Sequence, residues 1–188
     1  MSSKHYFHLT TNIHDSRTSV RMITYRARER RFNGTLPYPE VYYMSMEEEF
    51  LVAREVFALA GELGFGLVAM NVCRDHMHLL VYCSEEEVPV IMCRIKGRTA
   101  RVCNAHRAIK GIHPLDATRG VYEPRKLKDK SIPFWTQKYH RRKVQSTDQL
   151  LNTLMYIENN RKKHGLPFNS ALQELIDQNH QLLFRMRL

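Results

Sequence analysis

Two histidines separated by one residue are the sharpest chemical feature of the sequence. His76 and His78 lie in the segment DHMHLLV at residues 75–81. On a β-strand, residues two apart point to the same face, roughly 6.5–7 Å apart, so both imidazoles would project together while Met77 anchors the strand in the core. Two neutral imidazoles placed in this way can converge on one metal ion. They could equally be two partly exposed histidines on an open sheet face, so a metal site requires further partners.

A tyrosine and an asparagine four residues apart could be those partners. Tyr156 and Asn160 lie in a segment with apolar residues at helical spacing, so they are expected to be neighbours on one face of a helix. Asn160 could complete a His-His-Asn ligand set that leaves positions for water and a phosphate oxygen. Mixed nitrogen and oxygen ligation suits Mg²⁺ or Mn²⁺ acting on a phosphodiester. Tyr156 would then be the nucleophile, once deprotonated.

The charge of the chain favours a polyanionic partner. The 29 Lys and Arg residues exceed the 19 Asp and Glu residues and give a net charge of +10, which points to nucleic acid first and to an anionic membrane second. No basic amphipathic anchor or lipidation signal supports the membrane. No apolar run approaches the roughly 18 residues of a membrane span, and no signal-peptide core is present. A cytoplasmic protein without a membrane partner is therefore expected.

Basic residues gather in three segments that could contact DNA phosphates. Contacts of this kind bring affinity and salt dependence but little sequence information. Trp135 could stack on an unpaired base or belong to the core, and Tyr139 is a second candidate nucleophile that lacks a ligand partner one helical turn away. The residues expected to bind nucleic acid are Arg94, Lys96, Arg98, Arg101, Trp135, Lys138, Arg141, Arg142, Lys143, Arg161, Lys162 and Lys163.

The order of predicted elements indicates an α+β domain. Four reduced cysteines are expected, since no CxxC pair occurs. The pattern predicts an antiparallel sheet with helices packed mainly on one face. The elements are a strand at 6–14, a helix at 46–63, strands at 65–73 and 76–83, a helix at 86–107, a loop at 110–132, a strand at 134–144, a helix from 146 to about 165 and a short helix at 170–184.

The motifs, in this order, resemble those of the single-tyrosine transposases of the HUH endonuclease superfamily, and most closely the REP-associated tyrosine transposases. They are DHMHLLV at 75–81, RIKGR at 94–98, FWTQ at 134–137, YIENN at 156–160 and KHGL at 163–166. The resemblance implies a ferredoxin-like antiparallel sheet with helices mainly on one face plus a C-terminal tyrosine-bearing helix. It also implies a transposase domain over residues 1–166, followed by a short helical tail over 167–188.

The resemblance further implies an enzyme that cuts and rejoins single-stranded DNA, often at hairpin-flanked sites, through a covalent 5′-phosphotyrosine. His76 and His78 match the metal-binding pair of that family, Tyr156 the nucleophile and Asn160 the third ligand to Mg²⁺ or Mn²⁺. Some relatives are homodimers and others act as monomers. The sequence departs from the relatives at Arg161, where they commonly have proline. Two alternatives remain: a domesticated nucleic-acid-binding module without cleavage, and a nuclease that uses metal-bound water.

Overall fold

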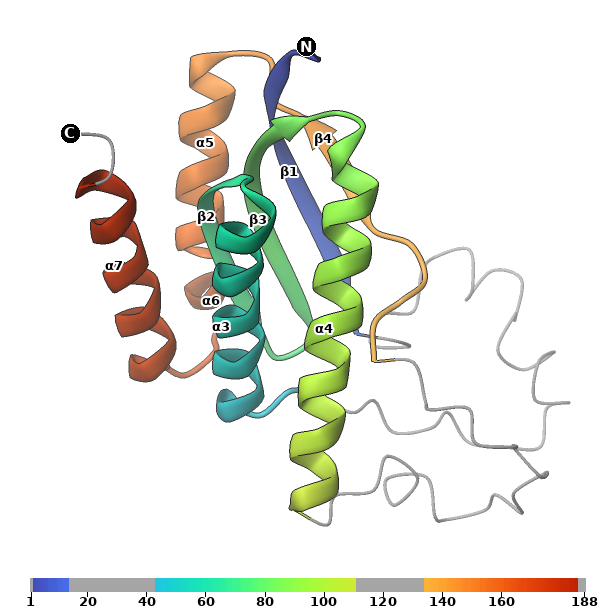
Figure 1. The fold of residues 1–188 in the computed structure, drawn as a ribbon. Helices are drawn as coiled ribbons and strands as arrows, with labels where there is room; N and C mark the ends of the chain where they lie inside the picture. The colour runs from blue at the N-terminus through green and yellow to red at the C-terminus, as the bar shows by residue number, and fades with distance from the viewer. Residues whose placement is uncertain (1, 14–42, 111–133, 186–188) are drawn as a thin grey trace, which may run out of the picture.

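The computed structural model describes residues 2–13, 43–110 and 134–185, which form an α+β fold (Figure 1). The predicted order of strands and helices is confirmed within these ranges, and the loop expected at 110–132 lies almost entirely outside them. The elements are β1 (Lys4–Asn12), α3 (Met46–Leu63), β2 (Gly66–Cys73), β3 (His76–Ser84), α4 (Glu87–Ile109), β4 (His140–Lys143), α5 (Thr147–Glu158), α6 (Asn160–Lys163) and α7 (Ser170–Arg185).

The four strands form an antiparallel sheet in the order β2-β3-β1-β4. This is the ferredoxin-like order, so the predicted fold class is confirmed. The last strand is shorter than the predicted 134–144, because only its end pairs with β1 and Trp135 makes an isolated bridge to Ile13. Between the two, the carbonyls of Thr136 and Gln137 accept hydrogen bonds from the Lys96 ammonium group and are not part of the ladder.

The two faces of the sheet carry different layers. Helices α3 and α4 cover one face, α7 packs on the outer side of α3, and α5 lies on the opposite face (Figure 1). The larger apolar core lies under α3 and α4, and α7 adds Leu172 and Ile176 to it. A smaller cluster lies under α5 and contains Ala69, Leu80, Val144 and Ile157, with Leu150 and Leu154 packed against it. The apolar residues at helical spacing on the tyrosine helix therefore face the sheet.

Strand alternation decides which residues of β3 face each layer. Met77, Leu79 and Val81 belong to the larger core, whereas Leu80 belongs to the cluster under α5. Because successive side chains on a strand point to opposite faces, His76 and His78 share the α5 side with Leu80. The histidine pair is thus directed at the helix that carries Tyr156.

Local signals bound the segment that was predicted as the tyrosine helix. The Ser146 hydroxyl accepts from the Gln149 backbone N–H, as a helix cap requires, and the Gln149 side chain accepts from the backbone N–H of Gln145. Gly165, just beyond the end of α6, has a left-handed φ of 61°. The helix was predicted to be continuous, whereas α5 ends at Glu158 and α6 begins at Asn160.

The interruption coincides with a hydrogen bond from β2. In a continuous helix the carbonyl of Ile157 would accept from the N–H of Arg161. That carbonyl instead accepts a 2.8 Å hydrogen bond from the side chain of Asn71 on β2. Across the described ranges, no helix is long and apolar enough to span a membrane.

Candidate active site

His76 opens β3 and is almost fully buried, with 1% of its surface exposed. Its Nδ1 lies 2.5 Å from a carboxylate oxygen of Asp75, and its Nε2 lies 2.7 Å from the amide oxygen of Asn160. A carboxylate beside Nδ1 holds the proton on that nitrogen and directs the lone pair of Nε2 outward. His76 therefore presents a basic nitrogen to Asn160.

His78, two residues further along β3, is held from the side of β1. Its Nδ1 lies 2.9 Å from the hydroxyl of Thr10 and 3.0 Å from Nε2 of His8. Its ring packs edge-on against that of His76, with the two centroids 5.0 Å apart. A histidine oriented through Nδ1 in this way can offer its other nitrogen to a metal ion.

Asn160 is brought to this pair by the short helix α6. It is fully buried, and its amide oxygen also accepts from the thiol of Cys73 on β2, at 3.3 Å. Two side-chain contacts fix the backbone on either side of it: Asn71 binds the carbonyl of Ile157, and the guanidinium of Arg161 reaches the carbonyl of Val72 at 3.2 Å. β2 therefore sets the position of Asn160 relative to β3.

The contact between His76 and Asn160 places two acceptors against each other. Nε2 carries a lone pair because Nδ1 faces Asp75, and the amide oxygen of Asn160 is an acceptor as well. A second proton on His76, a rotated Asn160 amide or a cation between the two atoms removes this repulsion. An imidazole nitrogen and an amide oxygen are both ligands that Mn²⁺ and Mg²⁺ accept. The residues present thus fit a divalent ion, with His78 beside them.

Tyr156 lies next to the histidine pair of its own chain. The centroid of its ring is 5.2 Å from that of His78 and 6.0 Å from that of His8. The side chain is 38% exposed, so the phenol can be reached by a polymeric substrate. The ammonium group of Lys163, two turns further along, lies 4.9 Å from the centre of the tyrosine ring, which places a positive charge beside the phenol.

Several neighbours of the pair were not singled out from the sequence. Asp75, Thr10 and His8 orient the two histidines, and the ring of His164 lies 5.0 Å from that of His76, centroid to centroid. His8 and Thr10 are found only once the register of β1 against β3 is known, because nothing in their local sequence marks them. Asp75 directly precedes the histidine motif and could have been proposed from it.

The local field at this face is positive. The pKa of His8 is lowered, chiefly by burial of the ring and further by the nearby charges of His140 and Arg142. These two β4 residues pair with Thr10 and His8 of β1, so their side chains share the face of the histidine pair. The lowered pKa of His8 favours its neutral form, and the guanidinium of Arg142 beside it leaves this edge suited to an anion.

The basic residues predicted on the second long helix lie on the other side of the sheet from Tyr156. Arg98 forms ion pairs with Glu55, at 2.7 Å, and with Glu62. The Lys96 ammonium group donates to the backbone of Thr136. This group, which comprises Arg94, Lys96, Arg98 and Arg101, belongs to α4, so a DNA strand bound at Tyr156 would reach it only by passing round the sheet.

Two further predicted DNA contacts have internal partners. Trp135 is 5% exposed, belongs to the larger core and donates from its indole to the hydroxyl of Thr99, at 2.9 Å. Arg161 donates to the carboxylate of Glu49 at 2.8 Å, and its side chain is 13% exposed. In this structure the side chain of Trp135 packs in the core, and that of Arg161 ties α6 to α3.

The remaining predicted contacts divide by face. On β4, Arg142 shares the face of Tyr156, whereas Arg141 and Lys143 pair with Leu9 and Phe7 and so point to the opposite side. Arg141 also pairs with a glutamate, Glu85, at 3.0 Å. The other predicted residues are exposed: Lys138 before β4, and Lys162 and Lys163 on α6.

Residues 44–113 match the family model described as "Transposase IS200 like". The match runs from the residue before the α3 cap through the histidine strand, and over these residues the chain is similar to the IS200-like transposase family. No curated protein is significantly similar to the sequence.

Solved structures share the fold. One is a REP-associated tyrosine transposase bound to a REP hairpin, which is 14% identical in sequence. The match covers 89% of this chain and 73% of that chain, with a TM-score of 0.51. Another is the crystal structure of a protein from Deinococcus radiodurans R1 that is provisionally assigned as a transposase and is 16% identical in sequence. The match covers 85% of this chain and 92% of that chain, with a TM-score of 0.43. The first of these shares its fold with this chain.

Proposed function

We propose that this chain is a transposase that cleaves and rejoins single-stranded DNA, with Tyr156 as nucleophile and a divalent ion held by His76, His78 and Asn160. The observation that carries the proposal is the convergence of three segments, β3, α5 and α6, on one spot. The phenol ring lies 5.2 Å from the ring of His78, and His76 lies 2.7 Å from Asn160. One chain contains all of these groups, so the site is proposed to act without residues from a second copy.

The chemical step exchanges one phosphodiester for another. The oxygen of Tyr156 gives up its proton and attacks phosphorus, the bond from phosphorus to the 3′ oxygen breaks, and the 3′ oxygen takes up a proton and leaves as a hydroxyl. The 5′ phosphate is then esterified to the tyrosine. A 3′ hydroxyl from another end can attack this ester and regenerate the phenol. Because the bond types match on both sides, joining needs no nucleoside triphosphate.

The residues around the phenol have separate tasks in this proposal. The ammonium group of Lys163, above the ring of Tyr156, stabilises negative charge that develops on the tyrosine oxygen. Asp75 and Thr10 hold the two imidazoles in place. A divalent ion held by the His-His-Asn set would polarise the scissile phosphate.

The DNA partner is proposed by analogy with the similar solved structure, which is bound to a REP hairpin. A strand that leaves a hairpin would place an unpaired phosphodiester at Tyr156, which is exposed enough to receive it. The net charge of +10 supports a polyanionic substrate.

The test is a covalent-adduct assay with single-stranded oligonucleotides from the flanks of the gene, in Mn²⁺ or Mg²⁺. The wild-type chain should form an adduct that resists denaturation, and mass spectrometry should place the nucleotide on Tyr156. Tyr156→Phe should form none. Tyr139→Phe is the matched control, because Tyr139 packs against the larger core on the other side of the sheet, and it should form the adduct normally.

Three outcomes contradict the proposal in different ways. Cleavage without an adduct, abolished by chelation, would favour a nuclease that activates water. Binding without cleavage in either metal would favour a domesticated binding module. An adduct that persists in Tyr156→Phe would move the nucleophile elsewhere in the chain.

A further inference from the structure

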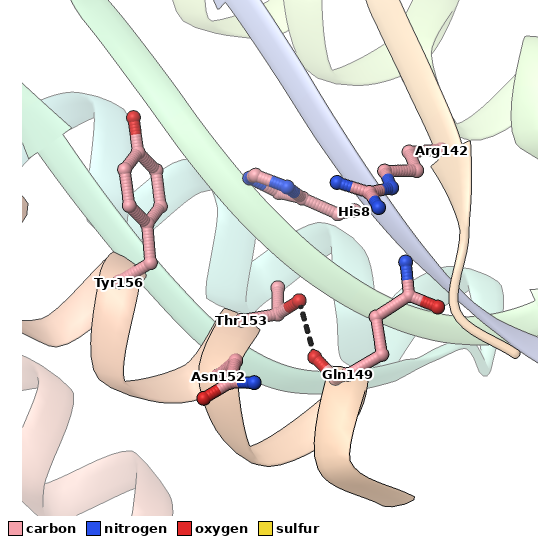
Figure 2. Close-up of a pocket in the computed structure, with 6 residues that line it drawn as sticks. All are labelled: His8, Arg142, Gln149, Asn152, Thr153 and Tyr156. Carbon is pink, nitrogen blue, oxygen red and sulfur yellow. Dashed lines mark hydrogen bonds between the residues drawn. The ribbon is translucent and has the colours of Figure 1, made fainter. Parts of the chain in front are cut away.

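A pocket of about 540 Å³ opens directly beside Tyr156, between α5 and the edge of the sheet (Figure 2). Its wall on the sheet side comes from β1 and β4, and its floor from four residues of α5 at helical spacing. The lining residues are His8, Arg142, Gln149, Asn152, Thr153 and Tyr156. They include no carboxylate. The volume lies within the range of small-ligand sites and exceeds what a lone phosphate group would need.

Arg142 supplies a positive charge to this pocket, which it lines together with His8. Its side chain forms no ion pair or hydrogen bond with the described residues. Its neighbour Arg141 differs on both points, because it faces the other side of the sheet and pairs with Glu85. One strand therefore presents one neutralised and one available guanidinium.

Gln149 adds a second donor next to Arg142. Its amide oxygen is occupied by the backbone N–H of Gln145, at 2.8 Å, so its NH₂ group is the part directed into the pocket. In Figure 2 that nitrogen points from α5 toward the guanidinium of Arg142. Thr153 beside it donates its hydroxyl to the backbone carbonyl of Gln149, which fixes this turn of the helix. Two donors that face one space without an internal acceptor suit an oxyanion.

We propose that this pocket binds one nucleotide adjoining the scissile phosphate of single-stranded DNA, with its phosphate held by Arg142 and the Gln149 amide. The inference rests on the proposed function for its position along the strand, since the pocket and the nucleophile share Tyr156. The rest of the volume accommodates sugar and base, and Asn152 lies along this floor with an exposed carboxamide. The pocket would set where the strand lies before attack and thus which linkage reaches the phenol.

The test uses the full chain carrying Tyr156→Phe, which cannot form an adduct, and a fluorescein-labelled oligonucleotide from the gene's flank. Dissociation constants are measured by anisotropy over a range of KCl concentrations. Adding Arg142→Gln should weaken binding and reduce the slope of log affinity against log salt by about 0.7, the value for one phosphate contact on a single strand. Adding Arg141→Gln removes the same charge from the other face and should leave the slope unchanged.

A set of oligonucleotides, each with one neutral methylphosphonate linkage, then locates the contact. One linkage should weaken binding when neutralised in the chain with Arg142 but not in the chain with Arg142→Gln, and it should adjoin the linkage that the wild-type chain cuts. Equal effects of the two arginine changes, or a penalty at that linkage that survives Arg142→Gln, would overturn the inference. If the wild-type chain forms no adduct but only Arg142→Gln lowers the slope, the proposed cleavage fails and the phosphate contact stands. If it forms the adduct but the two arginine variants bind alike, the subsite fails and the cleavage stands.

Discussion

The two faces of strand β3 are both buried, but one makes apolar contacts and the other makes polar contacts. On the α3 and α4 side, Met77 and Leu79 are completely buried in the larger core. On the α5 side, His76 and His78 are nearly as buried but make polar contacts with Asp75 and with β1. Burial alone therefore does not separate the structural face from the functional one. The difference lies in whether buried nitrogen and oxygen atoms converge on one point.

The same contrast appears in two adjacent threonines of β1. The hydroxyl of Thr10 lies on the α5 side and contacts Nδ1 of His78, at 2.9 Å. The hydroxyl of Thr11 lies on the core side, opposite Met77, and has no hydrogen-bond partner in the described part of the chain. A buried hydroxyl without a partner costs stability. The hydroxyl of Thr10 therefore helps to orient His78, whereas the hydroxyl of Thr11 lowers stability.

The largest effect should come from removing an imidazole on the α5 side. His78→Ala is expected to lower the rate of DNA cleavage by more than about 100-fold, beyond the 10–100-fold typical of residues that only orient a ligand. Binding of Mn²⁺, followed by the electron paramagnetic resonance signal of the free ion, should weaken in parallel. Near-normal cleavage with unchanged Mn²⁺ binding would show that His78 is not a ligand.

Truncating a residue on the core side of the same strand should lower the stability of the protein instead. Leu79→Ala removes a fully buried side chain and should lower the free energy of unfolding by about 2–5 kcal/mol, measured in urea. The fraction that remains folded should cleave DNA at close to the normal rate, because the variant leaves the α5 side in place. A loss of cleavage larger than the loss of folded protein would mean that the two faces are coupled.

The threonines allow a comparison at nearly constant shape. Thr10→Val should reduce metal affinity and cleavage by about 10–100-fold, because His78 loses a partner on Nδ1. Thr11→Val should leave cleavage unchanged and raise the free energy of unfolding by about 1 kcal/mol, since it removes an unpaired hydroxyl. Mn²⁺ titration and urea unfolding of both variants test the pair, and a reversed pattern would contradict the assignment of faces.

The smallest effect concerns Glu49, which links α3 to α6 through Arg161 and to α7 through Asn169. Burial raises the pKa of the Glu49 carboxyl above its usual value, against the effect of these two partners. The folded state therefore binds this proton more readily than the unfolded state, and stability falls as the pH rises from the ordinary glutamate range through the raised pKa. Glu49→Gln should remove that fall.

The measurement is the difference in unfolding free energy between wild type and Glu49→Gln at several pH values. Wild type should lose stability relative to the variant as the pH rises toward neutral. A difference that does not change with pH would show that the pKa of Glu49 is not raised. Other carboxyl groups, common to both proteins, cancel in this comparison.

Local sequence determined the elements that carry the chemistry. Helical spacing placed Tyr156 and Asn160 one turn apart, and strand alternation placed His76 and His78 on one face, because both periodicities depend only on backbone geometry. The end of α6 before Gly165 also follows from the local backbone, since glycine adopts a positive φ readily. These features need no knowledge of neighbouring segments.

Tertiary structure decided which other residues join them. Register between β1 and β3 brought Thr10 to His78, and register between β1 and β4 separated Arg142 from Arg141. A run of basic residues in the sequence does not show which of them form ion pairs within the protein. Arg161, for example, pairs with the carboxylate of Glu49. Ion pairing, strand register and the break between α5 and α6 all depend on groups distant in the chain, which is why periodicity alone could not predict them.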